Sequence, residues 1–352
     1  MTDPTRPVRE GEELDLAAAE SFLKSAIPDL EGPLEVSQFP SGASNLTYLV
    51  KAGDREMVLR RPPRGRKAKT AHDMSREVRV LTALADVYPY VPKVLASCDD
   101  PDVLGCDFYL MERLDGIILR KNLPRGMSLG REDTARLCRN VVNRLIDLHS
   151  IDYRAAGLGD LGKPDGYVRR QIEGWSRRYV NARTPNAPSY DRVMQWLDEK
   201  MPPEVGASVI HGDYRFDNVV LNPKNPLEVI GVLDWEMATI GDPLMDLGNS
   251  LAYWMQRGDP ILLRIMRLQP THLQGMMTRD EVVDYYCKKT GIEIETFDFY
   301  RIYGLFRLVV IMQQIYYRYY HRQTRNKRFG RFIYLIKYLE GYLERLIEGS
   351  AL

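Results

Sequence analysis

The sequence contains only four cysteines among its 352 residues, and none of them forms a C-x-x-C pair or belongs to a dense framework. They are Cys98, Cys106, Cys138 and Cys287. This sparse usage argues against a disulfide-stapled secreted fold and suits a reducing cytosol. Net charge is nearly absent as well, because 49 Lys and Arg residues are balanced by 48 Asp and Glu residues. The neutral balance gives no general attraction to nucleic acid or to a membrane surface.

Long apolar segments are also missing. The N-terminal 15 residues are polar and lack the apolar core of a signal peptide. The most apolar stretch, Leu305 to Tyr317, is interrupted by Arg307, Gln313 and Gln314, so it falls short of the roughly 20 apolar residues of a membrane span. We therefore expect a cytoplasmic protein with no nucleic-acid or membrane partner. At about 150 residues per domain, the length fits two domains or one domain of two lobes.

The first third of the sequence is mostly strand-like. Apolar residues at helical spacing predict helices over residues 16–27 and 75–85. Gly53-Asp54 predicts a hairpin turn, and the basic, proline-containing stretch 60–69 predicts a surface loop. Strands are predicted over residues 34–39, 46–51, 56–61, 91–97 and 108–113.

The remainder of the sequence is mostly helical. Apolar periodicity predicts helices over residues 131–149, 300–320 and 329–347. A capping box at Thr278 opens another helix, which ends before Gly291. The change of texture after Gly116 predicts an α+β protein with two lobes, residues 1–113 and residues 114–352.

The most informative segment, HGDYRFDN at residues 211–218, follows a short apolar strand. In it, Asn218 comes five residues after Asp213. A hairpin of two short strands over 219–233 is predicted next, with Asp234 at its end. One supersecondary unit therefore presents two carboxylates and an amide together.

These three side chains fit the needs of phosphoryl transfer. Mg²⁺ prefers hard oxygen ligands, usually one or two carboxylates with phosphate oxygens and water, and Asn218 and Asp234 supply such oxygens. Asp213 is then placed to orient an acceptor hydroxyl and to take its proton. Positioning and charge neutralisation matter more than base strength, because the transition state is loose.

HGDYRFDN, followed by LDWE and GDPLMDL, resembles the aminoglycoside phosphotransferase and choline kinase superfamily, which shares the protein-kinase-like fold. The resemblance runs from about Phe39 to the C-terminal helices. It implies a bilobal fold, with a small β-rich N-terminal lobe carrying one helix and a larger helical C-terminal lobe. It further implies a catalytic Asp213, magnesium ligands Asn218 and Asp234, and structural supports His211 and Asp246.

The same resemblance implies that the N-terminal lobe, residues 1–113, binds ATP or GTP. The loop between the first two strands contains one glycine where kinases have a G-x-G-x-x-G pattern. Arginine stands at the position of the kinase strand lysine, and it keeps a permanent charge that binds phosphate. The nucleotide-binding candidates are Ser41, Gly42, Ser44, Asn45, Arg60, its helix partner Glu77, and Glu112 of the hinge.

The C-terminal lobe, residues 114–352, is expected to bind the acceptor. Residues 301–347 contain ten basic and two acidic side chains, which suits an anionic ligand better than a polycationic aminoglycoside. The motif wording resembles most closely the kinase-like domains fused to acyl-CoA dehydrogenases, and this resemblance implies a hydroxyacyl-CoA as acceptor. Arg322, Arg325 and Arg328 are the candidate acceptor-binding residues.

Three other functions remain open from the sequence. A protein kinase is disfavoured, because LDW replaces D-F-G and GDP follows too soon for an activation loop. A catalytically inactive, kinase-like module that binds nucleotide or ligand is favoured by Arg60 and by the single-glycine loop. A nucleic-acid binder is suggested only by the basic tract and by the Tyr- and Arg-rich helix.

Overall fold

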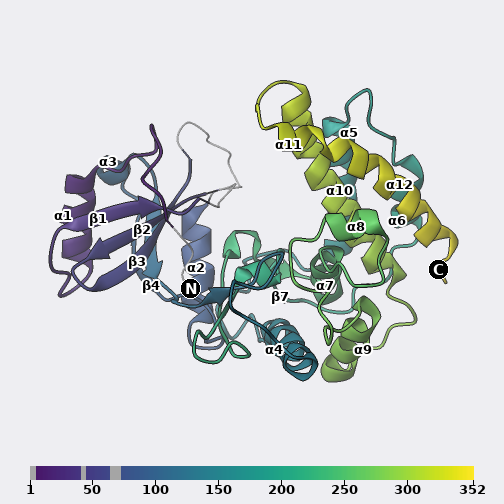
Figure 1. The fold of residues 1–352 in the computed structure, drawn as a ribbon, viewed down its shortest axis with the longest axis horizontal. Helices are drawn as coiled ribbons and strands as arrows, with labels where there is room; N and C mark the ends of the chain where they lie inside the picture. The colour runs from purple at the N-terminus through teal and green to yellow at the C-terminus, as the bar shows by residue number, and fades with distance from the viewer. Residues whose placement is uncertain (1–4, 41–44, 64–72) are drawn as a thin grey trace. The chain divides into compact units, whose positions relative to one another are not determined.

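The computed structural model describes residues 5–40, 45–63 and 73–352 (Figure 1). The described chain is α+β and divides into two compact units. Unit 1 is drawn from Met1–Ile118, Ala156–Leu158 and Asn218–Ala238, and unit 2 from Leu119–Ala155, Gly159–Asp217 and Thr239–Leu352. The division of roles between residues 1–113 and 114–352 stays a prediction. None of the helices described is long and apolar enough to cross a membrane.

Unit 1 is built on an antiparallel five-stranded sheet of order β1-β2-β3-β5-β4 (Figure 1). The two residues after Ala52 make the tight turn to Arg55, and Gly53 has a positive φ of 56°, so the expected hairpin is present. Arg60 and Arg61 belong to a strand, as predicted for residues 56–61, and are buried, so the surface loop expected over 60–69 does not include them. Residues 64–69 of that stretch lie outside the described residues. The strands are β1 (Leu34–Gln38), β2 (Leu46–Ala52), β3 (Arg55–Arg61), β4 (Val94–Cys98) and β5 (Phe108–Glu112).

Three helices accompany this sheet: α1 (Leu16–Ala26), α2 (Met74–Leu84) and the short α3 (Pro101–Leu104). Asp15 and Asp73 cap α1 and α2 by accepting backbone N–H groups of the first turn. Both α1 and α3 contribute to an apolar core with the sheet, whereas α2 buries Glu77 among Val80, Leu81 and Leu84. A carboxylate on a buried helix face needs a cationic partner, since an unpaired buried charge is strongly disfavoured.

Residues 218–238 fold with unit 1. Strands β8 (Val219–Leu221) and β9 (Val229–Val232) form a hairpin, β6 (Ile117–Ile118) pairs with β8, and the 3-10 turn η2 (Trp235–Met237) follows. The backbone N–H of Val232 donates to the carbonyl of Tyr90 at 2.6 Å. The hairpin therefore places the residues that follow it, including Asp234, in unit 1.

Unit 2 is helical, and α10 (Asp298–Tyr320) runs through its centre with buried residues on nearly every side (Figure 1). The helix expected over 329–347 is interrupted at Arg331, where α11 ends and α12 begins. The short strands β7 (Ser208–Ile210) and β10 (Thr239–Gly241) pair antiparallel. Along the chain, the 3-10 turn η1 (Phe216–Asn218) contains the change from unit 2 to unit 1, after Asp217. The other helices are α4 (Arg131–His149), α5 (Tyr167–Ala182), α6 (Asp191–Glu199), α7 (Pro243–Ala252), α8 (Ile261–Ile265), α9 (Arg279–Thr290), α11 (Lys327–Gly330) and α12 (Phe332–Glu348).

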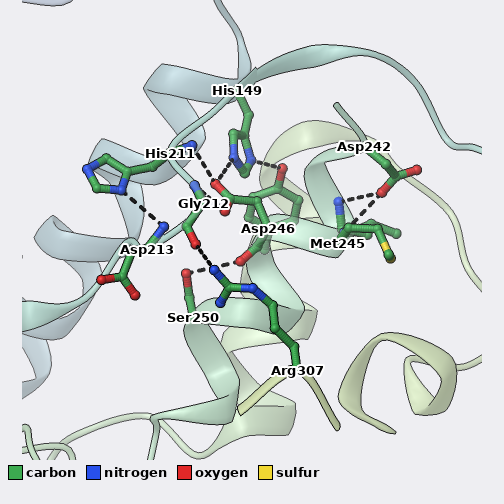
Figure 2. Close-up of polar contacts among 11 residues, drawn as sticks. His149, His211, Gly212, Asp213, Asp242, Met245, Asp246, Ser250 and Arg307 are labelled. Carbon is green, nitrogen blue, oxygen red and sulfur yellow. Dashed lines mark hydrogen bonds and ion pairs between the residues drawn. The ribbon is translucent and has the colours of Figure 1, made fainter. Parts of the chain in front are cut away.

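Helices α7 and α10 approach closely at two glycines. A Cβ atom on Gly248 would lie 2.5 Å from the carbonyl oxygen of Tyr300. A Cβ atom on Gly304 would lie 2.2 Å from the carbonyl oxygen of Gly248. Only residues without a side chain allow two helix backbones to meet at this spacing. The start of α7 is fixed by Asp242, whose carboxylate accepts the N–H groups of Leu244 and Met245 (Figure 2).

Candidate active site

The turn after β7 is held by the carboxylate of Asp246 in the first turn of α7 (Figure 2). The backbone N–H of His211 donates to Oδ2 of Asp246 at 2.9 Å, and that of Gly212 donates to Oδ1 at 2.8 Å. The side chain of Asp246 is fully buried. Burial would raise its pKa, but the hydrogen bond from His149 and the nearby imidazoles keep the pKa below its ordinary value. The ionised carboxylate thus fixes two successive peptide groups next to Asp213.

His149 supports Asp246 from the end of α4. Its Nε2 lies 3.1 Å from Oδ2 of Asp246, and its Nδ1 lies 2.7 Å from the hydroxyl oxygen of Tyr286 on α9. Both ring nitrogens of His149 are therefore engaged within the buried interior. Burial raises the pKa of Tyr286, so its hydroxyl stays un-ionised beside the imidazole. These two buried contacts link the end of α4 to α7 and α9.

Gly212 is held on its carbonyl side too. Nη2 of Arg307 on α10 donates to the Gly212 carbonyl at 2.8 Å, and the guanidinium lies 5.1 Å from the ring centre of Trp175 (Figure 2). Gly212 has a φ of 79°, in the left-handed region that favours glycine. The backbone N–H of Asp213 donates to Nδ1 of His211 at 3.2 Å. That contact engages the Nδ1 lone pair of His211.

Arg215 links two carboxylates beside this turn. Its Nη2 lies 3.1 Å from Oδ2 of Asp213, and its Nε lies 3.3 Å from Oδ1 of Asp217. The guanidinium also stacks 4.6 Å above the ring of Tyr253. Burial raises the pKa of Asp217, and Arg215 opposes that rise. Sequence reasoning missed Arg215, although its place two residues after Asp213 was a usable signal.

In unit 1, Arg60 is surrounded by three carboxylates. Its Nη1 lies 3.0 Å from Oε1 of Glu77, while Nη2 lies 3.1 Å from Oδ1 of Asp234 and 3.4 Å from Oε2 of Glu236. Burial would lower the pKa of Arg60, but the carboxylates, Glu77 above all, raise it. Burial raises the pKa of Glu77 in spite of Arg60. The buried cation on β3 therefore connects α2 to the residue after the β8–β9 hairpin.

Glu236 is a second residue that sequence reasoning missed. Besides Arg60, its Oε2 accepts a hydrogen bond from Nδ2 of Asn45 at 2.9 Å. Asn45, the last residue of the predicted phosphate loop, is buried directly before β2. Of that loop, Ser41, Gly42 and Ser44 lie outside the described residues. Asn45 alone therefore ties the described end of the predicted loop to the carboxylates around Arg60.

Asn218 and Asp234, the predicted metal ligands, are linked through the hairpin. The N–H of Leu233 donates to the backbone carbonyl of Asn218 at 2.8 Å. Asp234 adopts a left-handed conformation, with φ of 70° and ψ of 61°, and its side chain is 38% exposed. Such a conformation is strained for a residue other than glycine and is common at functional sites. Within the described chain, no group of three or more His, Cys, Asp or Glu side chains is arranged to hold a metal ion.

Comparison with models of protein families shows to which family the chain belongs. A family model described as "Phosphotransferase enzyme family" matches residues 35–276, which is more than half of the chain. The chain belongs to this family. Its kinase-like α+β fold and its family support a small-molecule phosphotransferase.

Relatives of this phosphotransferase include mouse (Mus musculus) acyl-CoA dehydrogenase family member 10, which is 38% identical over 317 residues. That match covers 89% of this chain but only 29% of the relative, so the chain spans less than a third of the relative's length. A solved structure of a candidate aminoglycoside phosphotransferase from Ralstonia eutropha JMP134 is 30% identical, with a TM-score of 0.82 over 97% of this chain and 100% of the other. Choline kinase from Cryptosporidium parvum Iowa II shares the fold at 13% identity, with a TM-score of 0.60 over 95% and 96% of the two chains.

The remaining predicted binding residues of this phosphotransferase are Glu112, in unit 1, and three arginines of unit 2. Glu112 ends β5, where its Oε1 accepts the N–H of Lys93 at 2.8 Å. Arg322, Arg325 and Arg328 are exposed where α10 turns into α11. Their roles toward nucleotide and acceptor stay predictions.

Proposed function

We propose that this phosphotransferase moves the γ-phosphoryl group of ATP or GTP to a hydroxyl group of a small anionic acceptor, with Mg²⁺ as cofactor. The observation that carries the proposal is the grip of Asp246 on the two N–H groups of His211 and Gly212. A carboxylate that must orient a hydroxyl within a few tenths of an ångström needs such a rigid backbone. The backbone of Asp213 itself is also held, because its N–H donates to Nδ1 of His211.

In the proposed reaction, a carboxylate oxygen of Asp213 accepts the proton of the acceptor hydroxyl. The hydroxyl oxygen forms a bond to the γ-phosphorus, and the bond from that phosphorus to the β–γ bridging oxygen breaks, so that the nucleoside diphosphate leaves. Arg215 keeps Asp213 oriented and adds positive charge near the transferred group. The proton thus moves to a side chain that the loop already holds in place.

The donor set fits a magnesium ion. Asn218 and Asp234 provide an amide and a carboxylate oxygen, and Mg²⁺ commonly takes one or two carboxylates together with phosphate and water oxygens. When bound, Mg²⁺ neutralises charge on the β- and γ-phosphate oxygens. Arg60 holds Oδ1 of Asp234 and leaves the rest of this partly exposed carboxylate available.

For the nucleotide, we propose a binding surface on unit 1. Its members are the predicted phosphate loop with Asn45, the Arg60–Glu77 ion pair, and the end of β5 at Glu112. Arg60 contacts three carboxylates through its two terminal nitrogens and keeps a permanent positive charge, which would attract phosphate oxygens to this surface. Ser41, Gly42 and Ser44 would add hydroxyl and backbone donors.

For the acceptor, we propose an elongated anion, a hydroxyacyl-CoA. The end of α10 lies about 20 Å along the helix axis from Arg307, at about 1.5 Å per residue. Arg307 contacts the turn at residues 211–213, called the catalytic turn below, through the carbonyl of Gly212. Arg322, Arg325 and Arg328 follow the end of the helix. A ligand that reaches both places is long and carries negative charge at its far end. The acyl-CoA dehydrogenase names of the relatives support the same class.

A second candidate is a catalytically inactive module that binds nucleotide or another ligand. The ion pair between Arg60 and Asp234 favours it, because an arginine that keeps Asp234 would compete with a metal ion. The intact set of Asp213, Asn218 and Asp234 opposes it. The two candidates differ in turnover and not in nucleotide affinity.

The test is a reaction of the protein with Mg-ATP and a pool of kanamycin, choline, homoserine and hydroxyacyl-CoA thioesters, followed by mass spectrometry. We expect one acceptor to gain a phosphoryl group, and Asp213→Asn to abolish the product while nucleotide binding persists. Nucleotide binding without any product would favour the inactive module. Charge reversal of Arg322, Arg325 and Arg328 to Glu should weaken acceptor binding and leave the KM for ATP unchanged, and unchanged acceptor affinity would refute the proposed contact.

A further inference from the structure

An apolar face is exposed on α8, a short helix of unit 2 that Figure 1 labels, and on the residues that follow it. Ile261 is 64% exposed, Leu262 40%, Ile265 59% and Leu268 48%. Four large apolar side chains within eight residues form a concentrated patch, and such patches on a soluble protein usually bind something. Leu263 of the same helix is buried and anchors the patch to unit 2.

The segment that carries this face is firmly held at both ends. Before it, the buried carboxylate of Asp259 pairs with both terminal nitrogens of Arg279 and accepts the N–H of Gln256. After it, the hydroxyl of Thr271 donates to the carbonyl of Met255 at 2.9 Å. The exposed face is therefore a fixed surface of the fold, and its apolar side chains are displayed in a defined arrangement.

Gln269 connects this segment to the catalytic turn. Its Oε1 accepts the backbone N–H of Phe216 at 2.7 Å, and its Nε2 donates to the carbonyl of Tyr253 at 3.1 Å. Phe216 lies three residues after Asp213, and the ring of Tyr253 supports Arg215. The apolar face and the catalytic turn thus share one hydrogen-bonded framework within unit 2.

The apolar residues are interspersed with positive charge. Arg264 is exposed on α8, and Arg267 donates to the carbonyl of Lys121 and to Oδ1 of Asn122. Neither guanidinium pairs with a carboxylate in the part of the chain that the structure describes. The pKa of His272 is lowered, first by burial and then by the positive charges of these two arginines. An apolar surface bordered by cations complements an aliphatic chain attached to an anionic group.

We propose that the face formed by Ile261, Leu262, Ile265 and Leu268 binds the aliphatic chain of an anionic acyl acceptor. This inference rests on the proposed function and deepens it, because it assigns the acyl part of the acceptor to a named surface. A chain lying on an exposed face buries one side only. The affinity should therefore rise about twofold for each added CH₂ group, below the roughly fourfold that complete burial gives.

The test measures binding by calorimetry without nucleotide, so it does not depend on phosphoryl transfer. The probes are coenzyme A, butanoyl-CoA, octanoyl-CoA and dodecanoyl-CoA, which lack the hydroxyl group, and free octanoate. We expect affinity to increase along the acyl-CoA series in the wild-type protein. In the double variant Ile261→Ser/Ile265→Ser this dependence on chain length should disappear, while coenzyme A binds as before. Comparable affinity for octanoate would identify the free acid as the natural form of the anion.

The matched control is Val180→Ser on α5, which removes another exposed apolar side chain of unit 2, 51% exposed, and should preserve the chain-length dependence. Dependence retained in the double variant, or absent from the wild type, would overturn the proposal. So would sedimentation showing a wild-type dimer that the double variant dissolves, because the face would then be covered by a second copy. Failure of the proposed kinase function would instead appear as an absent product in the acceptor screen, whatever these affinities are.

Discussion

Oδ1 of Asp246 accepts the backbone N–H of Gly212 at 2.8 Å, one residue before the proposed catalytic carboxylate of Asp213. The other oxygen of the same carboxylate accepts the N–H of His211 and contacts His149. A negative charge on α7 therefore determines the path of the catalytic turn. The consequences of this arrangement can be measured separately for stability, pH dependence and rate.

Asp246→Asn replaces one accepting oxygen with an NH₂ group that confronts a donor. We expect the free energy of unfolding to fall by about 3 kcal/mol, because a buried donor loses its partner and a charge-assisted bond is lost. The rate should fall about a hundredfold, the usual effect of displacing a catalytic group by about 1 Å. Urea denaturation and kcat for the identified acceptor measure the two effects. A variant with lowered stability but unchanged kcat would show that the contact does not position Asp213.

The stabilisation by Asp246 should depend on pH only in acid. Because the pKa of Asp246 is lowered in the folded protein, its contribution is complete above the unfolded value of about 4 and is lost as pH falls through the folded pKa. The difference in unfolding free energy between wild type and Asp246→Asn should be constant at neutral pH and shrink below about pH 4. A change centred near pH 6.5, where histidine ordinarily titrates, would instead assign the effect to His149.

The pair Arg60–Glu77 should show strong coupling in a double-mutant cycle. Arg60→Met leaves a buried Glu77 without its cation, and we expect a loss of about 3–5 kcal/mol of unfolding free energy. Adding Glu77→Gln should recover about 2 kcal/mol, because the uncompensated buried charge is removed. Thermal or urea denaturation of the four proteins completes the cycle. Additive losses would mean that Arg60 is stabilised mainly by Asp234 and Glu236.

Arg215→Lys tests whether the planar guanidinium is needed. A lysine has one nitrogen and cannot contact Asp213 and Asp217 through separate atoms while stacking on Tyr253. We expect kcat to fall about tenfold or more, by analogy with lost electrostatic stabilisation, while Tm changes little. Arg136→Lys on α4 is the control, since that arginine forms an exposed pair with Asp133 and such pairs contribute little. Equal kinetics of the two variants would exclude a special role for Arg215.

Gly304→Ala tests the close approach of α7 and α10. The added Cβ would lie 2.2 Å from the carbonyl oxygen of Gly248, which is backbone and has no rotamer to change. We expect a destabilisation of about 1–3 kcal/mol from overpacking. Gly341→Ala on α12 provides the matched control, because its Cβ would meet only the end of Arg345 at 3.6 Å. That variant should be about 0.5–1 kcal/mol more stable than wild type, as helical Gly-to-Ala changes generally are.

How far the sequence predicts this molecule depends on how local each signal is. The hairpin at Gly53, the capping box at Thr278 and the α+β class follow from short patterns, and the structure contains them. Helix α7 was not recognised as a helix, because all ten of its residues are buried and no amphipathic period exists. Helices α5 and α6 were also not predicted, although their buried residues do follow a helical period, for example Ile172, Trp175 and Tyr179 of α5.

The residues of the candidate site were likewise predictable only where their signal is local in the sequence. Asp246 and His211 could be named because they belong to contiguous motifs, and their contacts are now defined. Glu236 was missed because its importance arises from Asn45 and Arg60, both more than 170 positions away in the sequence. No local pattern indicates a contact of that kind. The exposed apolar face on α8 could not be predicted for a related reason, since apolar residues in a sequence normally indicate core.

The close approach of α7 and α10 at Gly248 and Gly304 affects more than the stability of the fold. Asp246 stands two residues before Gly248 on α7, and Arg307 stands three residues after Gly304 on α10. The first holds the N–H of Gly212 and the second its carbonyl. One backbone contact between two buried helices therefore positions the side chains that hold the two peptide groups on either side of the Gly212 Cα. Natural variation at positions 248 and 304 should accordingly mark lineages in which the reaction has been retuned or abandoned, even where every residue of the turn itself is unchanged.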